Sequence, residues 1–138
     1  MIDKHIAYLA FGTNLGDKEK NIERAYNMVE ERAGRILRRS SLMRSKPWGF
    51  VSENTFLNSV VCIETPLTPH QLLAVTQQIE REMGRKEKSS GGEYHDRLID
   101  IDILLYDDVN IQSPTLTIPH PLMTERDFVM TPLKEIKP

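Results

Sequence analysis

The sequence predicts an α+β fold in which a mostly antiparallel sheet and two amphipathic helices form a βαββαβ core with additions. Three observations support this prediction. Apolar residues alternate in segments 5–11, 56–64 and 98–106, they recur at helical spacing in segments 22–33 and 72–83, and turn-forming residues separate these segments. We expect two layers, helices on a sheet of four to six strands, with segments 45–55 and 85–96 as two long mobile loops.

Length and composition indicate one globular domain spanning residues 1–138. The chain is 39% hydrophobic and 28% charged, as in soluble proteins. The net charge of −2, with no basic tract, argues against nucleic-acid binding. We find no signal peptide and no membrane span. The single cysteine, Cys62, excludes an intrachain disulfide and is more typical of a small buried hydrophobe, so we expect a cytoplasmic protein.

The first half of the chain begins with a strand over residues 5–11, followed by a glycine-containing turn over residues 12–17. This turn is no P-loop, because Asp17 is followed by Lys18 and Glu19 instead of the Gly-Lys-Ser/Thr ending. A core-facing helix follows and ends near Gly34. Residues 36–44 are expected to form a second strand.

The irregular segment 45–55 carries the only tryptophan, Trp48. A tryptophan here is compatible with a lid over a flat ligand or with an anchor that holds the loop. The strand 56–64 follows and places Asn58 on a largely apolar face. Asn58 needs a hydrogen-bond partner, either the main chain or a polar heterocycle.

The second helix has clear start signals: Thr68 as N-cap, Pro69 in the first turn and Gln71 for a capping box. We expect it to end at Gly84. Gln77 and Glu80 are three residues apart, so they share one flank near its C-terminal end. The glycine- and serine-rich segment 85–96 could close over a polyphosphate or form a solvated hairpin loop.

The strand over residues 97–106 contains an Asp-x-Asp pair. Alternation places Asp100 and Asp102 on one face with Leu98 and Leu104, their Cα atoms about 6.6 Å apart. The opposite face is an apolar row, comprising Ile99, Ile101, Ile103 and Leu105. The aspartates are compatible with Mg²⁺ binding, since Mg²⁺ commonly uses one or two carboxylates plus phosphates. Two solvated carboxylates are the alternative.

The C-terminal part turns at residues 107–108, runs extended to residue 118, and makes a rigid corner at residues 119–121. A short helix over residues 124–130 should be closed by Thr131-Pro132. His120 lies between two prolines, so it is a held, oriented imidazole or a surface side chain. No His/Cys spacing resembles a zinc site.

These segments carry a resemblance to one family. Asp96-Arg97-Leu98-Ile99-Asp100-Ile101-Asp102 and Ile118-Pro119-His120-Pro121-Leu122 are similar to signatures of the 6-hydroxymethyl-7,8-dihydropterin pyrophosphokinases. Matches in order and spacing cover nearly the whole chain, namely Gly12-Thr13-Asn14-Leu15-Gly16-Asp17, Pro47-Trp48-Gly49, Phe56-Leu57-Asn58, Gln77-x-x-Glu80 and Arg126-x-Phe128. The family has a ferredoxin-like core and moves a pyrophosphoryl group from ATP to a pterin alcohol in folate biosynthesis.

The resemblance implies a role for each matching residue. Two Mg²⁺ ions would be held by Asp100 and Asp102, and Arg85 and Arg97 would neutralise charge developing during transfer. ATP would contact Gln77, Glu80, Arg85, Tyr94, Arg97, Ile103, His120 and Arg126. The pterin would lie against Ser45, Lys46, Trp48, Phe56, Asn58, Asp100 and Phe128.

Some features depart from the family's pattern. Tyr94 stands where many relatives carry tryptophan, and His95-Asp96 where they carry a Gly-Pro or similar pair, so we expect effects on turnover and loop closure and not a loss of activity. Phe56 lacks the hydroxyl of the usual tyrosine but keeps its aromatic face. Strict alternation also puts Arg97 on the face opposite Asp100. Either the regular strand starts after Arg97 or the arginine reaches round its end.

Two other functions remain open from the sequence. A non-catalytic nucleotide-binding regulatory module could use the same ferredoxin-like scaffold. A Mg²⁺-dependent phosphohydrolase would need the aspartates but not the aromatic pocket. For the pyrophosphokinase we expect ATP and the pterin as partners, no nucleic acid or membrane, and a monomer or homodimer.

Overall fold

The computed structural model describes residues 4–46, 55–84 and 98–137. Its elements, in chain order, are β1 (His5–Thr13), α1 (Lys18–Arg32), β2 (Arg35–Arg39), β3 (Met43–Ser45), β4 (Phe56–Thr65), α2 (Pro69–Glu82), β5 (Asp100–Tyr106), β6 (Ile111–Gln112), β7 (Thr117–Ile118), the 3-10 helix η1 (Met123–Glu125) and α3 (Asp127–Ile136). The expected mobility of the two irregular segments concerns residues mostly outside these ranges. None of the described helices is long and apolar enough to cross a bilayer.

The main sheet has the strand order β2-β4-β1-β5. β2 pairs with the C-terminal half of β4, and β3 pairs with its N-terminal end. Every pairing is antiparallel, including the separate β6–β7 ladder. The prediction of an α+β fold with a mostly antiparallel sheet is therefore confirmed. The order is consistent with a ferredoxin-like core if β2 and β3 are taken as one interrupted strand.

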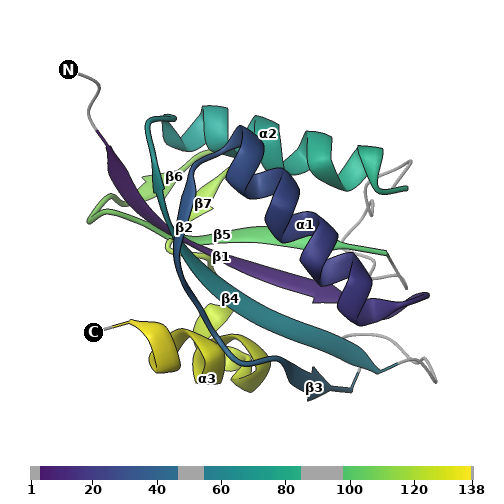
Figure 1. The fold of residues 1–138 in the computed structure, drawn as a ribbon. Coiled ribbons are helices and arrows are strands. Elements are labelled where there is room, and N and C mark those ends of the chain that lie inside the picture. The colour runs from purple at the N-terminus through teal and green to yellow at the C-terminus, as the bar shows by residue number, and fades with distance from the viewer. Residues whose placement is uncertain (1–3, 47–54, 85–97, 138) are drawn as a thin grey trace.

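The helices cover both faces of this sheet. α1 and α2 lie on one side and α3 lies on the other (Figure 1). The expected two layers are thus three, because the C-terminal helix buries its apolar side against the face that α1 and α2 leave open.

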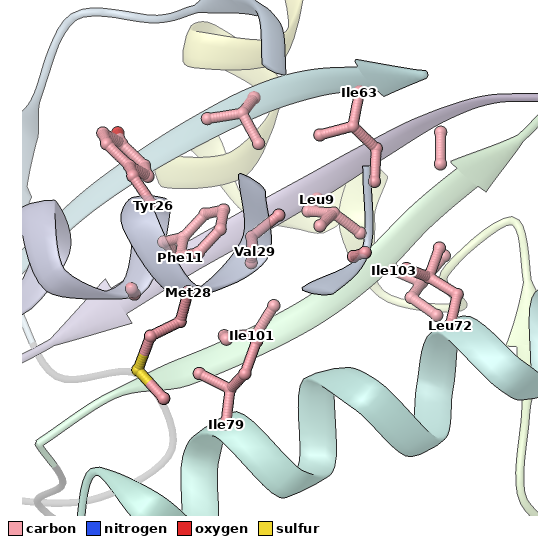
Figure 2. Packing of buried hydrophobic residues seen from close by; sticks show 14 of the residues in the cluster. Leu9, Phe11, Tyr26, Met28, Val29, Ile63, Leu72, Ile79, Ile101 and Ile103 are labelled. Carbon is pink, nitrogen blue, oxygen red and sulfur yellow. The ribbon is translucent and has the colours of Figure 1, made fainter. Parts of the chain in front are cut away.

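Two apolar clusters follow from this arrangement. The larger one joins α1 and α2 to the sheet and includes Phe11, Val29, Ile79 and Ile101 (Figure 2). The smaller one lies under α3, where side chains of that helix meet Val60 of β4. The central strands β1, β4 and β5 therefore bury side chains on both faces of the sheet.

The two long helices begin and end as their sequences indicate. Asp17 caps α1, and Thr68 with Gln71 forms the expected capping box of α2. Gly84 follows α2 with a φ of +119°, a conformation that suits glycine. Gly34 follows α1 for a different reason: a Cβ there would lie 2.2 Å from the backbone oxygen of Glu64.

The expected strand over residues 36–44 is interrupted at Ser40. Its backbone N–H donates to the Val60 carbonyl at 2.9 Å, whereas the Val60 N–H donates to the Ser40 hydroxyl oxygen, also at 2.9 Å. The Ser40 hydroxyl thus takes the place of a main-chain acceptor, so the regular pairing of β2 with β4 ends here. β3 resumes pairing with β4 at Met43.

β5 contains an irregularity that alternation did not predict. Ile103 pairs with Leu9 and Leu105 pairs with Tyr8, so Leu104 is left over as a bulge. Leu104 is buried in the cluster under α3, and Leu105 packs against the same cluster. The prediction that Leu105 continues the apolar row of Ile103 is therefore wrong, because the bulge moves it to the other face.

The C-terminal helix also differs from expectation. α3 spans Asp127–Ile136 and contains Pro132, which the sequence suggested as its end. Pro132 itself is buried, as are Leu133 and Ile136 beyond it. Burial of these later residues outweighs the one intrahelical hydrogen bond that a proline removes.

Candidate active site

Polar residues from neighbouring strands meet on the sheet face that α3 covers. Gly12 in β1 pairs with Asp100 on one side and with Asn58 on the other, and Asn58 pairs in turn with Met43 of β3. Directly paired residues point to the same face. A carboxylate, a glycine and an amide thus form one row across the sheet.

The two aspartates share this face. Asp102 pairs with Ala10, a member of the cluster under α3. Both carboxylate residues are half-buried, so they are not the two fully solvated side chains of the alternative interpretation. A Cβ on Gly84 would lie 2.7 Å from Leu98 Cδ1, which places Leu98 at the end of α2. The prediction that Leu98 flanks the aspartates is wrong, because the regular strand begins only at Asp100.

Gly12 adds no side chain to the middle of the row. A Cβ on this residue would lie 3.4 Å from Asn58 Oδ1 and 3.7 Å from Phe56 Cδ1, which are ordinary contacts. The position that a side chain would take at Gly12 is therefore bordered by an amide oxygen and an aromatic ring. A flat group with hydrogen-bond donors on its edge suits such a space.

Asn58 is held in one orientation. Only 4% of the residue is exposed, and its Nδ2 donates to the Met43 carbonyl at 3.0 Å and to Ser45 Oγ at 2.8 Å. Both amide hydrogens are engaged, so Oδ1 is the atom that the side chain offers at Gly12. The partner that the sequence required is therefore main chain together with Ser45.

α2 approaches the same strand from the opposite face. Glu80 is 6% exposed, and its Oε2 accepts the backbone N–H of Ile101 at 2.8 Å. Gln77, on the same flank, is half-buried. The side chain of Ile103 lies in the large core cluster, so only its backbone could contact a ligand.

His120 is held next to β5 by two hydrogen bonds. Its backbone N–H donates to the Leu104 carbonyl at 3.0 Å, and its ring Nδ1 accepts the backbone N–H of Leu122 at 3.3 Å. Burial lowers the pKa of His120, the positive charge of Arg126 lowers it further, and Asp100 opposes both. A neutral ring with Nδ1 as acceptor carries its proton on Nε2. Of the two sequence-based interpretations, the held imidazole fits.

Arg126 and Phe128 border the site at the start of α3. Arg126 is buried, and its guanidinium carbon lies 5.8 Å from the centre of the Phe128 ring. Phe128 is half-buried against the cluster under α3. A cation is thus placed next to an aromatic face close to His120.

The donor set suits magnesium better than a resident transition metal. No group of three or more His, Cys, Asp or Glu side chains that could hold a metal occurs within residues 4–46, 55–84 and 98–137. Two carboxylates on one strand match Mg²⁺, which fills its remaining positions with water and substrate phosphates.

The sequence profile of the 7,8-dihydro-6-hydroxymethylpterin-pyrophosphokinase (HPPK) family matches residues 8–138. This match includes all three residues of the row, Asp100, Gly12 and Asn58. The chain belongs to the HPPK family.

Individual HPPK relatives agree. The 2-amino-4-hydroxy-6-hydroxymethyldihydropteridine pyrophosphokinase of Porphyromonas gingivalis is 49% identical over 134 residues, covering 96% of this chain and 91% of the relative. The enzyme of the same name from Bacillus subtilis is 41% identical over 133 residues, covering 96% and 78%. The comparisons give no support to a non-catalytic regulatory module.

Solved structures show the same fold. Wild-type Plasmodium falciparum HPPK-DHPS, crystallised with pteroate, aligns with a TM-score of 0.77 at 17% identity. The alignment covers 96% of this chain and 41% of the other, so this chain spans about two fifths of that protein. At this identity the likeness concerns the fold alone.

The structure gathers most of the residues expected from the HPPK resemblance. The face of the row carries Ser45, Phe56, Asn58, Asp100 and Asp102. His120 is close to Asp100 and Arg126, Phe128 packs against the cluster under α3, and Glu80 contacts β5 from the opposite face. Lys46 is exposed beyond the end of β3. Trp48, Arg85, Tyr94 and Arg97 lie outside the described residues. Sequence reasoning missed Gly12 because it assigned this residue to a turn after residue 11, whereas β1 continues to Thr13. A glycine inside a strand is a signal for close approach of a ligand.

Proposed function

We propose that this chain transfers pyrophosphate from ATP to the hydroxymethyl group of 6-hydroxymethyl-7,8-dihydropterin and releases AMP in folate biosynthesis. The observation that carries the proposal is the row Asp100–Gly12–Asn58. It joins a carboxylate pair suited to phosphate-bound Mg²⁺ with a position without a side chain, at Gly12, that suits a flat heterocycle. Family membership supplies the reaction.

The pterin would bind above Gly12. Its ring would lie between the aromatic faces of Phe56 and Phe128, and a donor on its edge would bind Asn58 Oδ1. Because Ser45 holds Asn58 in place, the acceptor is pre-organised before the pterin arrives. From the family resemblance, Lys46, Trp48 and Asp100 would complete this side of the site.

ATP would bind along the free edge of β5. Among the described strands, β5 pairs only with β1. Alternation turns the backbone groups of Ile103 to the same side as the N–H of Ile101. Gln77 and Glu80 border that edge from α2. On the other side we place His120 as a neutral Nε2–H donor and Arg126 as a fixed positive charge. Arg85, Tyr94 and Arg97 are assigned to ATP by the resemblance.

Asp100 and Asp102 would hold two Mg²⁺ ions together with the ATP phosphates. When bound, the ions supply positive charge that offsets the charge on the transferred group. The carboxylates are half-buried, which limits competition by water for these positions. The enzyme would therefore depend on Mg²⁺.

The reaction needs positioning more than covalent catalysis. The pterin hydroxymethyl oxygen forms a bond to the β-phosphorus of ATP, the bond from that phosphorus to the α,β-bridging oxygen breaks, and AMP leaves. The alcohol proton is released. Arg126, with Arg85 and Arg97, would balance the negative charge that spreads over the phosphate oxygens.

The remaining proposals concern the whole chain. Residues 1–138 would act as a single domain, as a monomer or homodimer in the cytoplasm. Neither nucleic acid nor membrane would be a partner.

The carboxylate pair tests this function directly. Asp100→Asn and Asp102→Asn should each abolish AMP formation from ATP and the pterin while the unfolding temperature changes little. Asp108→Asn, an exposed aspartate just after the same strand, is the matched control and should keep wild-type turnover. Retained turnover in either of the first two variants would remove that residue from the metal site.

A further inference from the structure

The buried carboxylate of Glu80 contacts the backbone of the metal-binding strand. Its Oε2 lies 2.8 Å from the nitrogen of Ile101, and only 6% of Glu80 is exposed. Ile101 is the residue between Asp100 and Asp102. The carboxylate therefore holds the peptide that links the two proposed metal ligands.

α2 holds this residue in a second way. The side chains of Ile79 and Ile101 lie in the same core cluster (Figure 2). Ile79 and Glu80 are consecutive on α2, so one turn of helix fixes both the side chain and the main chain of Ile101. Within residues 4–46, 55–84 and 98–137, β5 is an edge strand of the sheet, so α2 contributes to setting its position on that side.

The direction of approach matters. Asp100 and Asp102 project to the face covered by α3, as their partners Gly12 and Ala10 show. Glu80 reaches the strand from α2, on the opposite face. It acts on the aspartates through the backbone, as outer partners of metal ligands commonly do.

We propose that Glu80 is a positioning residue that fixes the spacing and direction of Asp100 and Asp102 by accepting the Ile101 N–H. The inference rests on the proposed Mg²⁺ site and goes beyond an ATP contact for this residue. What matters in this role is an acceptor oxygen at the right reach, and not the negative charge.

Two conservative variants separate reach from charge. Glu80→Gln loses the charge but keeps an acceptor oxygen at the same distance from the helix. Glu80→Asp keeps the charge but is one methylene shorter, so it cannot reach Ile101 without movement of α2. Glu82→Asp changes an exposed glutamate at the end of α2 that pairs with Arg32 of α1, and it is the matched control.

Two readouts are needed. Hydrogen exchange of the Ile101 amide, followed by NMR on the free protein, reports the hydrogen bond itself. Mn²⁺ binding, followed by its EPR signal in the presence of a non-hydrolysable ATP analogue, reports the metal site. Asp100→Asn is measured beside them as the reference for a lost ligand.

We expect Glu80→Asp to speed exchange of the Ile101 amide and to weaken Mn²⁺ binding by about 10- to 100-fold. Glu80→Gln should protect the Ile101 amide from exchange as wild type does and should weaken Mn²⁺ binding less than Glu80→Asp. Glu82→Asp should stay close to wild type in both measurements. The reverse order, with Glu80→Asp intact and Glu80→Gln weakened, would show that charge matters and would overturn the proposal. So would unchanged Mn²⁺ binding in Glu80→Asp while Asp100→Asn loses it. If Asp100→Asn also binds Mn²⁺ normally, the assignment of Asp100 to the metal site is wrong.

Discussion

At the scale of single residues, Gly12 contributes through the side chain it lacks. It lies between Asp100 and Asn58 in the sheet, where any larger residue would project a side chain onto the face that carries these two residues. A Cβ would meet Asn58 and Phe56 at ordinary contact distances. The fold can therefore accept alanine, whereas a ring resting on the strand cannot.

We expect Gly12→Ala to weaken pterin binding selectively. Overpacking of this kind costs about 1–3 kcal/mol, which corresponds to a roughly 5- to 150-fold higher Kd. Isothermal titration with the pterin measures the effect. Binding of an ATP analogue and the unfolding temperature serve as controls and should change little. An unaltered pterin Kd would mean that the ring does not lie above Gly12.

His120 gives the folded state a pH dependence. Burial and Arg126 lower its pKa below the ordinary value. Between that lowered pKa and about 6.5 the unfolded chain binds more protons at this residue than the folded chain does, so the free energy of unfolding rises with pH. The contribution of His120 to the free energy of unfolding is complete above about pH 6.5 and is lost as the pH falls through the lowered pKa.

Replacing His120 by asparagine should flatten this dependence. Urea unfolding of both proteins between about pH 8 and pH 5 would measure the slopes, with the values near pH 8 as the common reference. We expect wild type to lose more stability than His120→Asn over this range. Equal losses would mean that the imidazole is not held as a neutral group.

At the scale of secondary structure, the turn from α1 into β2 depends on Gly34. A Cβ at this position would lie 2.2 Å from the Glu64 oxygen and 2.9 Å from Thr65 Cα, both backbone atoms of β4. Neither atom can move without disturbing the sheet. Close approach, and not left-handed backbone, explains this glycine.

We therefore expect Gly34→Ala to destabilise the fold by about 1–3 kcal/mol or more. The exposed Asn27→Ala on α1 is the control and should be neutral or slightly stabilising, because alanine favours helices. Chemical denaturation of the two variants gives the comparison. Full stability of Gly34→Ala would show that β2 can shift away from β4.

The sequence predicted elements well where one local rule decided them. Capping residues set the start of α2 at Thr68, and periodicity identified both long helices and the three central strands. It failed where tertiary packing decided. Leu104 forms a bulge, Ser40 interrupts a strand with its side chain, and Pro132 continues a helix because its neighbours are buried.

The site was predictable to a similar extent. Asp100, Asp102, Asn58 and His120 each stand out as polar residues in apolar or rigid surroundings. Gly12 did not, because its role depends on which residues pair across three strands, and register is not visible in a single chain segment. The bond from Glu80 to Ile101 depends on the same tertiary contact.

At the scale of the whole molecule, the sheet separates two tasks. The face under α1 and α2 is a continuous apolar core. The opposite face carries the aspartates, Gly12 with Asn58, and the cation at the start of α3. The two are linked at β5, where α2 contacts the backbone of the strand whose side chains form the site.

The central claim is that this site moves pyrophosphate from ATP to a pterin alcohol. The most direct test is to incubate the protein with ATP and Mg²⁺, with and without 6-hydroxymethyl-7,8-dihydropterin, and to separate the nucleotides formed. We expect AMP, together with the pterin diphosphate, only when the pterin is present. ADP as the product, or nucleotide breakdown that does not require the pterin, would contradict the claim.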